Sequence, residues 1–500
     1  MITGRRILIE VAINIGFAVI RLVALLIVIR LASAAFSPET LGVFLLARRL
    51  ASTVASLLQL GSSQTLLRYM PMAKSAGARR RYVAVACVLW VGVAAIGVAA
   101  LFPARSRVAT WAFPGFADGP ELTVWTAGLT VASVLGFVAY TSFLSEHRLV
   151  LANTVELMSV SGFLLLGLTG PVAALTPTAL LRFQALGMVI LCATAVAGYL
   201  MVTSEPGSQP DRQPTWAEAS HVFITYGLPR GGIAALDIAI LTIGPWFLRG
   251  QPAQAGYLLV ALTMVQVIQV ALGPITQIAS IVAASLVGRG DMARLGEEVR
   301  LLLGGTLYAS ALALAMLVPW SGYLFHLWLR DPELAAGVSY YFSWLVWGIL
   351  PVTLFQALRG IIEMRWFAPW NLYTLLSAAA AQVLVYEVAR GLLGETAAVR
   401  AALLTTFWTM GGLTLGLLDI SWWRPLHYWG IGRLAGVSGV VALVNGLLAE
   451  RPGMPEVLLG LALSVAIVFV GLGWWASPPA VRAVRAFLWP RAALEPPRRT

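Results

Sequence analysis

Apolar runs of membrane-spanning length recur along the whole chain, and they limit its fold more than any other feature. A helix that crosses about 30 Å of hydrocarbon needs about 20 residues. Such runs occupy 7–31, 41–66, 82–102, 122–144, 149–170, 178–202, 220–248, 254–286, 300–320, 338–362, 370–390, 397–420, 432–448 and 456–475. Hydrophobic residues make up 59% of the chain and charged residues 11%, which excludes a water-soluble globule. We predict an all-α polytopic membrane protein with about 14 transmembrane helices.

The distribution of Lys and Arg predicts how these helices are oriented. With a cytoplasmic N-terminus, the cytoplasmic segments hold 21 of these residues and the external segments hold 7. Cytoplasmic loops of membrane proteins carry this excess, so the net charge of +12 reports topology rather than nucleic-acid binding. We expect a multi-pass protein of the cytoplasmic (inner) membrane with both termini on the cytoplasmic side.

The longest polar break divides the chain into two halves that resemble each other. Under a shift of 214 residues, Pro38 aligns with Pro252 and Gly42 with Gly256. An even number of helices per half gives parallel repeats with a substrate site between them. We predict an N-terminal lobe of six helices at 1–202, a cytoplasmic linker at 203–219, a C-terminal lobe of six helices at 220–420, an extra helix pair at 421–475 and a basic cytoplasmic tail at 476–500. The two lobes would be related by a pseudo-twofold axis.

Arg21 lies near the middle of the first apolar run. An arginine at that depth costs about 2.5–3.5 kcal/mol, so it should face protein or a watery cavity rather than lipid. The positions three and four residues away hold Phe17, Ala18, Ala24 and Leu25, so its own helix supplies no acid. We predict that Arg21 lines a path for an anionic substrate.

Arg48 and Arg49 lie in the second run at a depth that nearly matches that of Arg21. Adjacent residues on a helix are splayed by about 100°, so at least one of the two should point inward. Guanidinium forks match phosphate oxygens in a bidentate way. The candidate substrate-binding cations are therefore Arg21, Arg48, Arg49 and Arg230. The alternative is that these side chains bond to helix-end carbonyls or snorkel to the membrane surface.

Glu156 and Asp237 are lone acids inside apolar runs, and both are candidates for ion coupling. A buried carboxylate can exchange a proton or help to bind Na⁺, which would couple transport to an H⁺ or Na⁺ gradient. Asp237 could instead be a structural partner of Arg230, seven residues earlier on the same face. Arg359 has Glu363 four residues on, a spacing that predicts an interfacial ion pair.

The seventh run is interrupted by Gly227, Pro229, Gly231 and Gly232. Proline removes a backbone donor and the glycines loosen the helix, so a bend is expected here. These residues are our candidate hinge. A static kink is the alternative, because Gly and Pro are common in membrane helices.

The chain shows no recognisable catalytic set and no metal-ligand spacing. Cys87 and Cys192 both fall inside apolar runs, and the four histidines are dispersed. Phosphate-binding GxxxxGK[ST] loops and GxSxG elbows are missing from the sequence. We therefore expect no catalytic residues, no metal and no cofactor. Membrane glycan polymerases and glycosyltransferases, the alternative from a different class, would bring larger external loops.

Several short motifs resemble the polysaccharide (lipid-linked oligosaccharide, O-antigen type) flippases of the multidrug/oligosaccharidyl-lipid/polysaccharide exporter superfamily. The residues that carry the likeness are Arg21, the stretches Ser37–Gly42 and Leu67–Pro71 with Gly61 before it, and the stretches Tyr226–Arg230 and Ala255–Tyr257. The resemblance implies two six-helix lobes around a cationic central cavity, with Arg21 as a cavity arginine.

By the same resemblance, the chain would move an undecaprenyl-diphosphate-linked oligosaccharide from the cytoplasmic to the outer leaflet by alternating access. Its partners would be this polyprenyl-diphosphate-linked glycan, the lipid bilayer and polysaccharide assembly proteins, and no nucleic acid. Lipid II flippases and cation-coupled drug exporters of the same superfamily remain alternatives. Lipid II flippases usually continue from an equivalent arginine into Gly-Phe-Ala-Arg-Asp, whereas here the residues are 22–26, LVALL.

Overall fold

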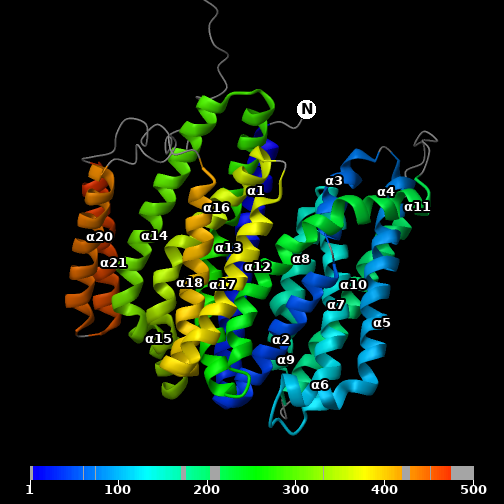
Figure 1. Cartoon of the computed structure of the whole chain (residues 1–500), viewed down its shortest axis with the longest axis horizontal. Coiled ribbons are helices and arrows are strands. Elements are labelled where there is room, and N and C mark those ends of the chain that lie inside the picture. The colour runs from blue at the N-terminus through cyan, green and yellow to red at the C-terminus, as the bar shows by residue number, and fades with distance from the viewer. Residues whose placement is uncertain are drawn as a thin grey trace, which may run out of the picture.

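The computed structural model describes residues 4–473 except for 60, 74, 171–175, 203–213, 330, 367, 419–427 and 451. All regular elements in this part are helices (Figure 1). Before the polar linker lie α1 (Gly4–Ala35), α2 (Pro38–Leu58), α3 (Ser62–Met72), α4 (Ala76–Ala86), α5 (Gly92–Leu101), α6 (Arg105–Ala112), α7 (Gly119–Ser145), α8 (Leu149–Leu157), α9 (Phe163–Thr169) and α10 (Pro177–Val202). We call these ten helices the first half.

After the linker lie α11 (Trp216–Val222), α12 (Leu228–Phe247), α13 (Pro252–Gly288), α14 (Met292–Trp328), α15 (Pro332–Leu345), α16 (Ile349–Arg365), α17 (Trp370–Leu393) and α18 (Glu395–Gly416), which we call the second half. The last two described helices are α20 (Tyr428–Ala449) and α21 (Met454–Gly473). Three of the connections are π-helical segments. They are η1 (Cys87–Val91) between α4 and α5, η3 (Met158–Gly162) between α8 and α9, and η4 (Phe223–Gly227) between α11 and α12. The 3₁₀ turns η2 (Phe102–Ala104) and η5 (Val346–Gly348) join α5 to α6 and α15 to α16.

The all-helical membrane architecture predicted from the sequence is confirmed, but the count of fourteen spans is not. By length and composition, nine of the described helices can cross a membrane, and a tenth can if α11 and α12 form one bent span. The described parts of α13, α20 and α21 contribute shorter apolar helices. The basic tail at 476–500 and most of the linker at 203–219 lie outside the described residues.

The long helices run side by side, and α20 and α21 pack on α14 at one edge of the molecule (Figure 1). We call the end of the molecule that carries α3, α4 and α11 the arginine-rich end, since Arg68, Arg79, Arg80 and Arg81 lie on these helices. It is the upper end in Figure 1, and the distribution of Lys and Arg along the chain predicts that it is cytoplasmic.

A shared apolar core joins the two halves. Fully buried side chains from α2, α15 and α16, among them Phe44, Tyr341 and Phe355, belong to one large cluster. A second cluster lies mainly in the first half, where it includes Leu66 of α3, and it also takes in Phe223 of η4 from the second half. Burial of aromatic and branched side chains on this scale fixes the helices relative to one another.

Two glycines bring α2 and α13 into contact near their first turns. A Cβ built on Gly42 would lie 1.8 Å from the Pro252 oxygen, and one built on Gly256 would lie 3.2 Å from the Pro38 oxygen. The two helices begin at Pro38 and Pro252, which are equivalent under the 214-residue shift. A twofold axis produces this kind of reciprocal contact. It supports the predicted repeat, whose lobe boundaries stay a prediction.

The seventh span bends where the sequence predicts a bend. Segments Trp216–Gly227 and Arg230–Phe247 meet at 51°. The π-helical segment η4 ends at this point, and Pro229 in the next turn supplies no N–H to the helix. Whether the bend moves as a hinge stays a prediction.

Candidate functional site

Helix α2 carries two stripes of residues with different surroundings. Arg49 and Thr53 lie against the second half, whereas Arg48, Ser52 and Gln59 line a cavity inside the first half. Within each stripe the residues lie four or more positions apart and share a face, and neighbouring residues diverge by about 100°. The adjacent arginines therefore point to different sides of one helix.

Arg48 is held by a backbone carbonyl. Its Nη2 donates a hydrogen bond of 2.9 Å to the oxygen of Val160, which belongs to the π-helical segment η3. A π-turn replaces i→i+4 bonds with i→i+5 bonds and so frees a carbonyl for another donor, which is why such turns accompany functional sites. Within the described residues Arg48 has no carboxylate partner.

Arg49 crosses to the second half. With the Gln266 amide turned so that its oxygen faces the guanidinium, that oxygen accepts from Nη1 at 2.8 Å and from Nη2 at 3.2 Å. One turn further along α2, the hydroxyls of Thr53 and Thr242 lie 2.7 Å apart. These contacts tie α2 to α13 and α12 through neutral groups.

Arg21 has a partner on another helix. Its guanidinium pairs with the carboxylate of Glu156 on α8, and Glu156 lies on the wall of the cavity. The side chains of Arg21 and Glu156 are 20% and 31% exposed, so the pair is largely buried. Nearby, Asn153 donates to Asn14 at 3.0 Å and so also links α8 to α1. The first candidate cation and the first candidate coupling acid are thus one ion pair.

Asp237 also has a partner, but not the one suggested by spacing. Arg359 of α16 donates to it at 2.9 Å, and Gln356 donates at 3.4 Å. The predicted pairing of Arg359 with Glu363 is therefore wrong, because Arg359 reaches Asp237 of α12, an acid less exposed than Glu363. Asp237 likewise does not pair with Arg230.

Arg230 lies apart from the other three candidate cations, at the arginine-rich end. It lies in the first turn of α12, about 10 Å along the helix from Asp237. Its guanidinium stacks on the ring of Tyr226, with Cζ 4.1 Å from the ring centroid, and Arg68 stacks on the same ring at 4.6 Å. The two motif stretches 67–71 and 226–230 thus lie against each other at the arginine-rich end.

The cavity beside Arg48 has a volume of about 370 Å³. It is enclosed by α2, α3, α7, α8, η3 and α10, with Ala234 of α12 closing one side. Gln184 is 3% exposed on its wall and donates to the Ser159 carbonyl at 3.0 Å, while its Oε1 accepts no hydrogen bond. A buried amide oxygen of this kind can accept a hydrogen bond from a polar ligand.

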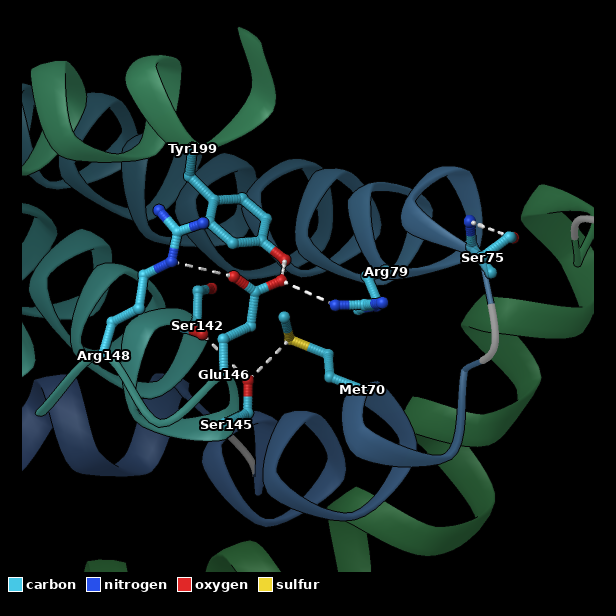
Figure 2. Close-up of polar contacts among 9 residues, drawn as sticks. Met70, Ser75, Arg79, Ser142, Ser145, Glu146, Arg148 and Tyr199 are labelled. Atoms are coloured by element: carbon cyan, nitrogen blue, oxygen red, sulfur yellow. Dashed lines mark hydrogen bonds and ion pairs between the residues drawn. The ribbon is translucent and has the colours of Figure 1, made fainter. Parts of the chain in front are cut away.

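Sequence reasoning missed Glu146, the most heavily bonded acid at the arginine-rich end. Its carboxylate accepts from Arg79 at 3.3 Å, from Arg148 at 3.3 Å and from the Tyr199 hydroxyl at 2.7 Å (Figure 2). The side chain is 8% exposed, and it binds together α4, the α7–α8 turn and α10. The only sequence signal was its position in a short Glu-His-Arg turn of an expected cytoplasmic loop.

No group of three or more His, Cys, Asp or Glu side chains that could hold a metal occurs in the part of the chain described by the structure. The site therefore consists of guanidiniums, two ion pairs and a cavity lined by hydroxyls and amides. Such an arrangement can bind and orient an anion, and it offers no evident nucleophile activated by a general base.

Comparisons with known proteins bear on the fold. The MatE family model matches residues 253–386. A lipid II flippase, MurJ, in an inward closed conformation superposes with a TM-score of 0.72 at 10% identity, covering 93% of this chain and 99% of that one. The fold is that of the MOP-superfamily transporters. An inward-facing multidrug resistance MATE transporter of that superfamily gives 0.64 at 13% identity, covering 85% of this chain and 98% of that one.

A MOP-superfamily transporter from Pyrococcus furiosus, whose binding pocket is described as having reverse polarity, gives a TM-score of 0.54 at 11% identity. The match covers 86% of this chain and 94% of the Pyrococcus furiosus chain. A sequence comparison with curated proteins gave no match. These likenesses show the fold of the superfamily that the motifs resemble, while membership of its O-antigen branch stays a proposal.

Proposed function

We propose that this protein is a MOP-superfamily flippase that moves an undecaprenyl-diphosphate-linked oligosaccharide across the cytoplasmic membrane by alternating access. The observation that carries the proposal is the adjacent pair Arg48 and Arg49. Both guanidiniums belong to α2, Arg48 on the side of the cavity in the first half and Arg49 on the side of the second half, and both are held by neutral acceptors. Such a pair keeps its charge available for an anionic cargo.

The charges around this pair support an anionic cargo. Glu156 is bound by Arg21 and Asp237 is bound by Arg359, so each of these deep acids is already matched by one cation. Arg48 and Arg49 remain as a surplus of positive charge. In a low-dielectric setting this surplus concentrates anions, and two guanidinium forks match the two phosphates of a diphosphate.

The cavity gives the cargo's polar part a place to bind. Arg48 and Ser52 from α2 and Gln184 from α10 converge on it, and the free Gln184 oxygen can accept a hydroxyl donor. We propose that the diphosphate contacts Arg48 and Arg49 while the first sugar enters this cavity. The polyprenyl chain would stay in the bilayer.

Glu156 and Asp237 are the proposed coupling residues for an H⁺ or Na⁺ gradient. Protonation of either acid, or Na⁺ binding to it, would release its arginine and change the contacts between helices. Release of Arg21 would break the ion pair between α1 and α8, and release of Arg359 would break the ion pair between α12 and α16.

The test is flipping of a fluorescent polyprenyl-diphosphate-linked glycan by the protein in liposomes. We expect Arg48→Gln and Arg49→Gln each to slow flipping at least tenfold, because each removes one charge-assisted contact of about 1.5–3 kcal/mol. The matched control is Arg105→Gln, which removes the same charge from a site where, within the described residues, the Arg105 guanidinium bonds to the Phe102 carbonyl and lies over the Phe102 ring. Full flipping in the double variant would refute the proposal.

The same assay separates the alternatives. Preference for lipid II over other diphosphate-linked glycans would make the protein a lipid II flippase. Cation export that depends on Asp237 or Glu156 but not on Arg48 and Arg49 would make it a drug exporter. Conversion of the glycan by the purified protein would point to a polymerase or glycosyltransferase.

A further inference from the structure

The arginine-rich end holds a second set of unmatched cations, apart from Arg48 and Arg49. Arg68 of α3 and Arg230 of α12 lie on the ring of Tyr226, with Cζ at 4.6 Å and 4.1 Å from its centroid. Tyr69 meets the same ring edge-on at a centroid distance of 5.6 Å. One aromatic ring therefore holds two guanidiniums from different halves of the chain.

Backbone contact fixes this arrangement. Gly61, the N-cap residue of α3, has a positive φ of 77°, and a Cβ built on it would lie 1.9 Å from the Gly227 oxygen. A Cβ on Gly227 would in turn lie 2.5 Å from the Thr65 hydroxyl. Only glycine allows the first turn of α3 and the end of η4 to approach this closely. Arg68 and Tyr226 are thus brought together by the chain itself, without an ion pair.

The two cations keep most of their hydrogen-bonding capacity. Each guanidinium has five N–H donors. Arg230 donates one bond, at 3.4 Å, to the Tyr226 carbonyl. Arg68 is exposed, and its hydrogen bond to the Tyr226 side chain raises the pKa of Arg68, so it stays charged at cellular pH. The remaining donors of both side chains are available to a ligand.

Two acids of this end are engaged by other groups. Glu146 is bound by Arg79, Arg148 and Tyr199, and Glu218 accepts from the backbone N–H of Thr215 in a capping box. Within the described part of the chain, neither Arg68 nor Arg230 forms an ion pair with a carboxylate. The ring of Tyr226 thus holds two positive charges that no acid in direct contact neutralises.

We infer that Arg68 and Arg230 form a docking site for a diphosphate group at the arginine-rich end, separate from Arg48 and Arg49. The two phosphates of a diphosphate are adjacent, and each can take one guanidinium fork. Because the site has one residue from each half, a bound diphosphate links α3 to α12. The inference rests on the proposed function in that the cargo carries the diphosphate.

The test measures binding of inorganic pyrophosphate and of geranyl diphosphate to the full-length protein in phosphatidylcholine nanodiscs. Arg68→Gln and Arg230→Gln should each weaken binding about tenfold, the loss expected for one charge-assisted contact. The matched control is Arg81→Gln, which removes the same charge at the same end, where Arg81 stacks on Trp216 at 5.5 Å. It should leave the affinity within about twofold. The thermal unfolding midpoint confirms that each variant is folded.

Unchanged affinity in folded Arg68→Gln and Arg230→Gln proteins would overturn this inference. Suppose that these variants bind normally and that the Arg48→Gln, Arg49→Gln double variant loses both binding and flipping. This result would contradict the docking site and support the proposed function. If the Arg68 and Arg230 variants lose binding while no arginine variant slows flipping, the result would support the docking site and contradict the proposed function.

Phosphate chemistry is shared by the cargo and by ordinary anionic phospholipids. Nanodiscs with about one third phosphatidylglycerol separate the two sources. Retained pyrophosphate affinity supports a site for the cargo. If the pyrophosphate affinity is lost in these nanodiscs and is regained in phosphatidylcholine alone, phospholipid headgroups fill the site. This result would overturn the assignment to the cargo.

Discussion

At the scale of single residues, the buried charges are matched across helices. At the depth of Arg21, the free energy of exposing a charged guanidinium to lipid is too high. Glu156 of α8 supplies the counter-charge that the helix of Arg21 lacks. Removing one member of such a pair leaves the other charge buried and alone, whereas removing both is close to neutral. The contribution of the pair is therefore best measured as a coupling between two substitutions.

We expect Arg21→Met to lower the free energy of unfolding by about 3 kcal/mol and Glu156→Gln in the same chain to recover most of the loss. The measurement is denaturant unfolding in detergent. Arg30→Met serves as the control, since Arg30 lies on the same helix with an exposed side chain, and it should change stability by less than about 1 kcal/mol. Additive effects of Arg21→Met and Glu156→Gln would show that the two groups do not interact.

At the scale of elements, α2 organises the junction between the halves. Its face against the second half is made of Gly42, Arg49 and Thr53, and a glycine at the first of these positions permits the crossing with α13. The close approach of two backbones allows no side chain there. Helix packing, rather than helix propensity, therefore selects glycine.

Gly42→Ala should lower the free energy of unfolding by about 1–3 kcal/mol, because the added methyl group would overlap the Pro252 carbonyl and force the helices apart. Thermal unfolding in detergent measures the effect. Gly97→Ala in α5 is the matched control: a Cβ there meets nothing within 4 Å, so alanine should be neutral or slightly stabilising. Equal midpoints for the two variants would mean that α2 and α13 do not touch at Gly42.

The terminal helix pair is attached to α14 by a buried polar network. The indole of Trp320 donates to Asn445 at 2.7 Å, and the Asn445 amide donates to Ser464 at 2.8 Å. We expect Asn445→Leu to leave the buried Trp320 indole N–H without its acceptor, while the Ser464 hydroxyl keeps its bond to the Gly460 carbonyl, and to lower stability by about 2 kcal/mol. Limited proteolysis between α20 and α18 measures release of the pair. Leu443→Ala, which changes an exposed side chain of the same helix, should have no effect on cleavage.

At the scale of the whole molecule, the proposed alternating-access mechanism predicts that the two halves separate along α2. The hydroxyls of Thr53 and Thr242 lie 2.7 Å apart across this junction, so cysteines at both positions should form a disulfide. In a background with Cys87 and Cys192 replaced by serine, oxidation of the Thr53→Cys, Thr242→Cys protein should stop flipping, and a reductant should restore it. Each single-cysteine variant is the control. Transport at full rate by the cross-linked protein would mean that the halves move elsewhere.

The sequence by itself determined the membrane environment, the helical class, the bend at 227–232 and the register that aligns Pro38 with Pro252. These features depend on local properties, since hydropathy decides which segments enter the bilayer and Gly and Pro act on their own turn. The depth of Arg48 and Arg49 also follows from position along one helix.

Only the tertiary structure decided the partner of each buried charge. Asp237 pairs with Arg359, 122 residues away, although Glu363 lies one turn from that arginine. The orientation of Arg48 to the cavity and of Arg49 to α13, and the meeting of Arg68 with Tyr226, depend on the rotation and crossing of packed helices. Those are set by the sum of many contacts between distant segments, so spacing along the chain does not specify them.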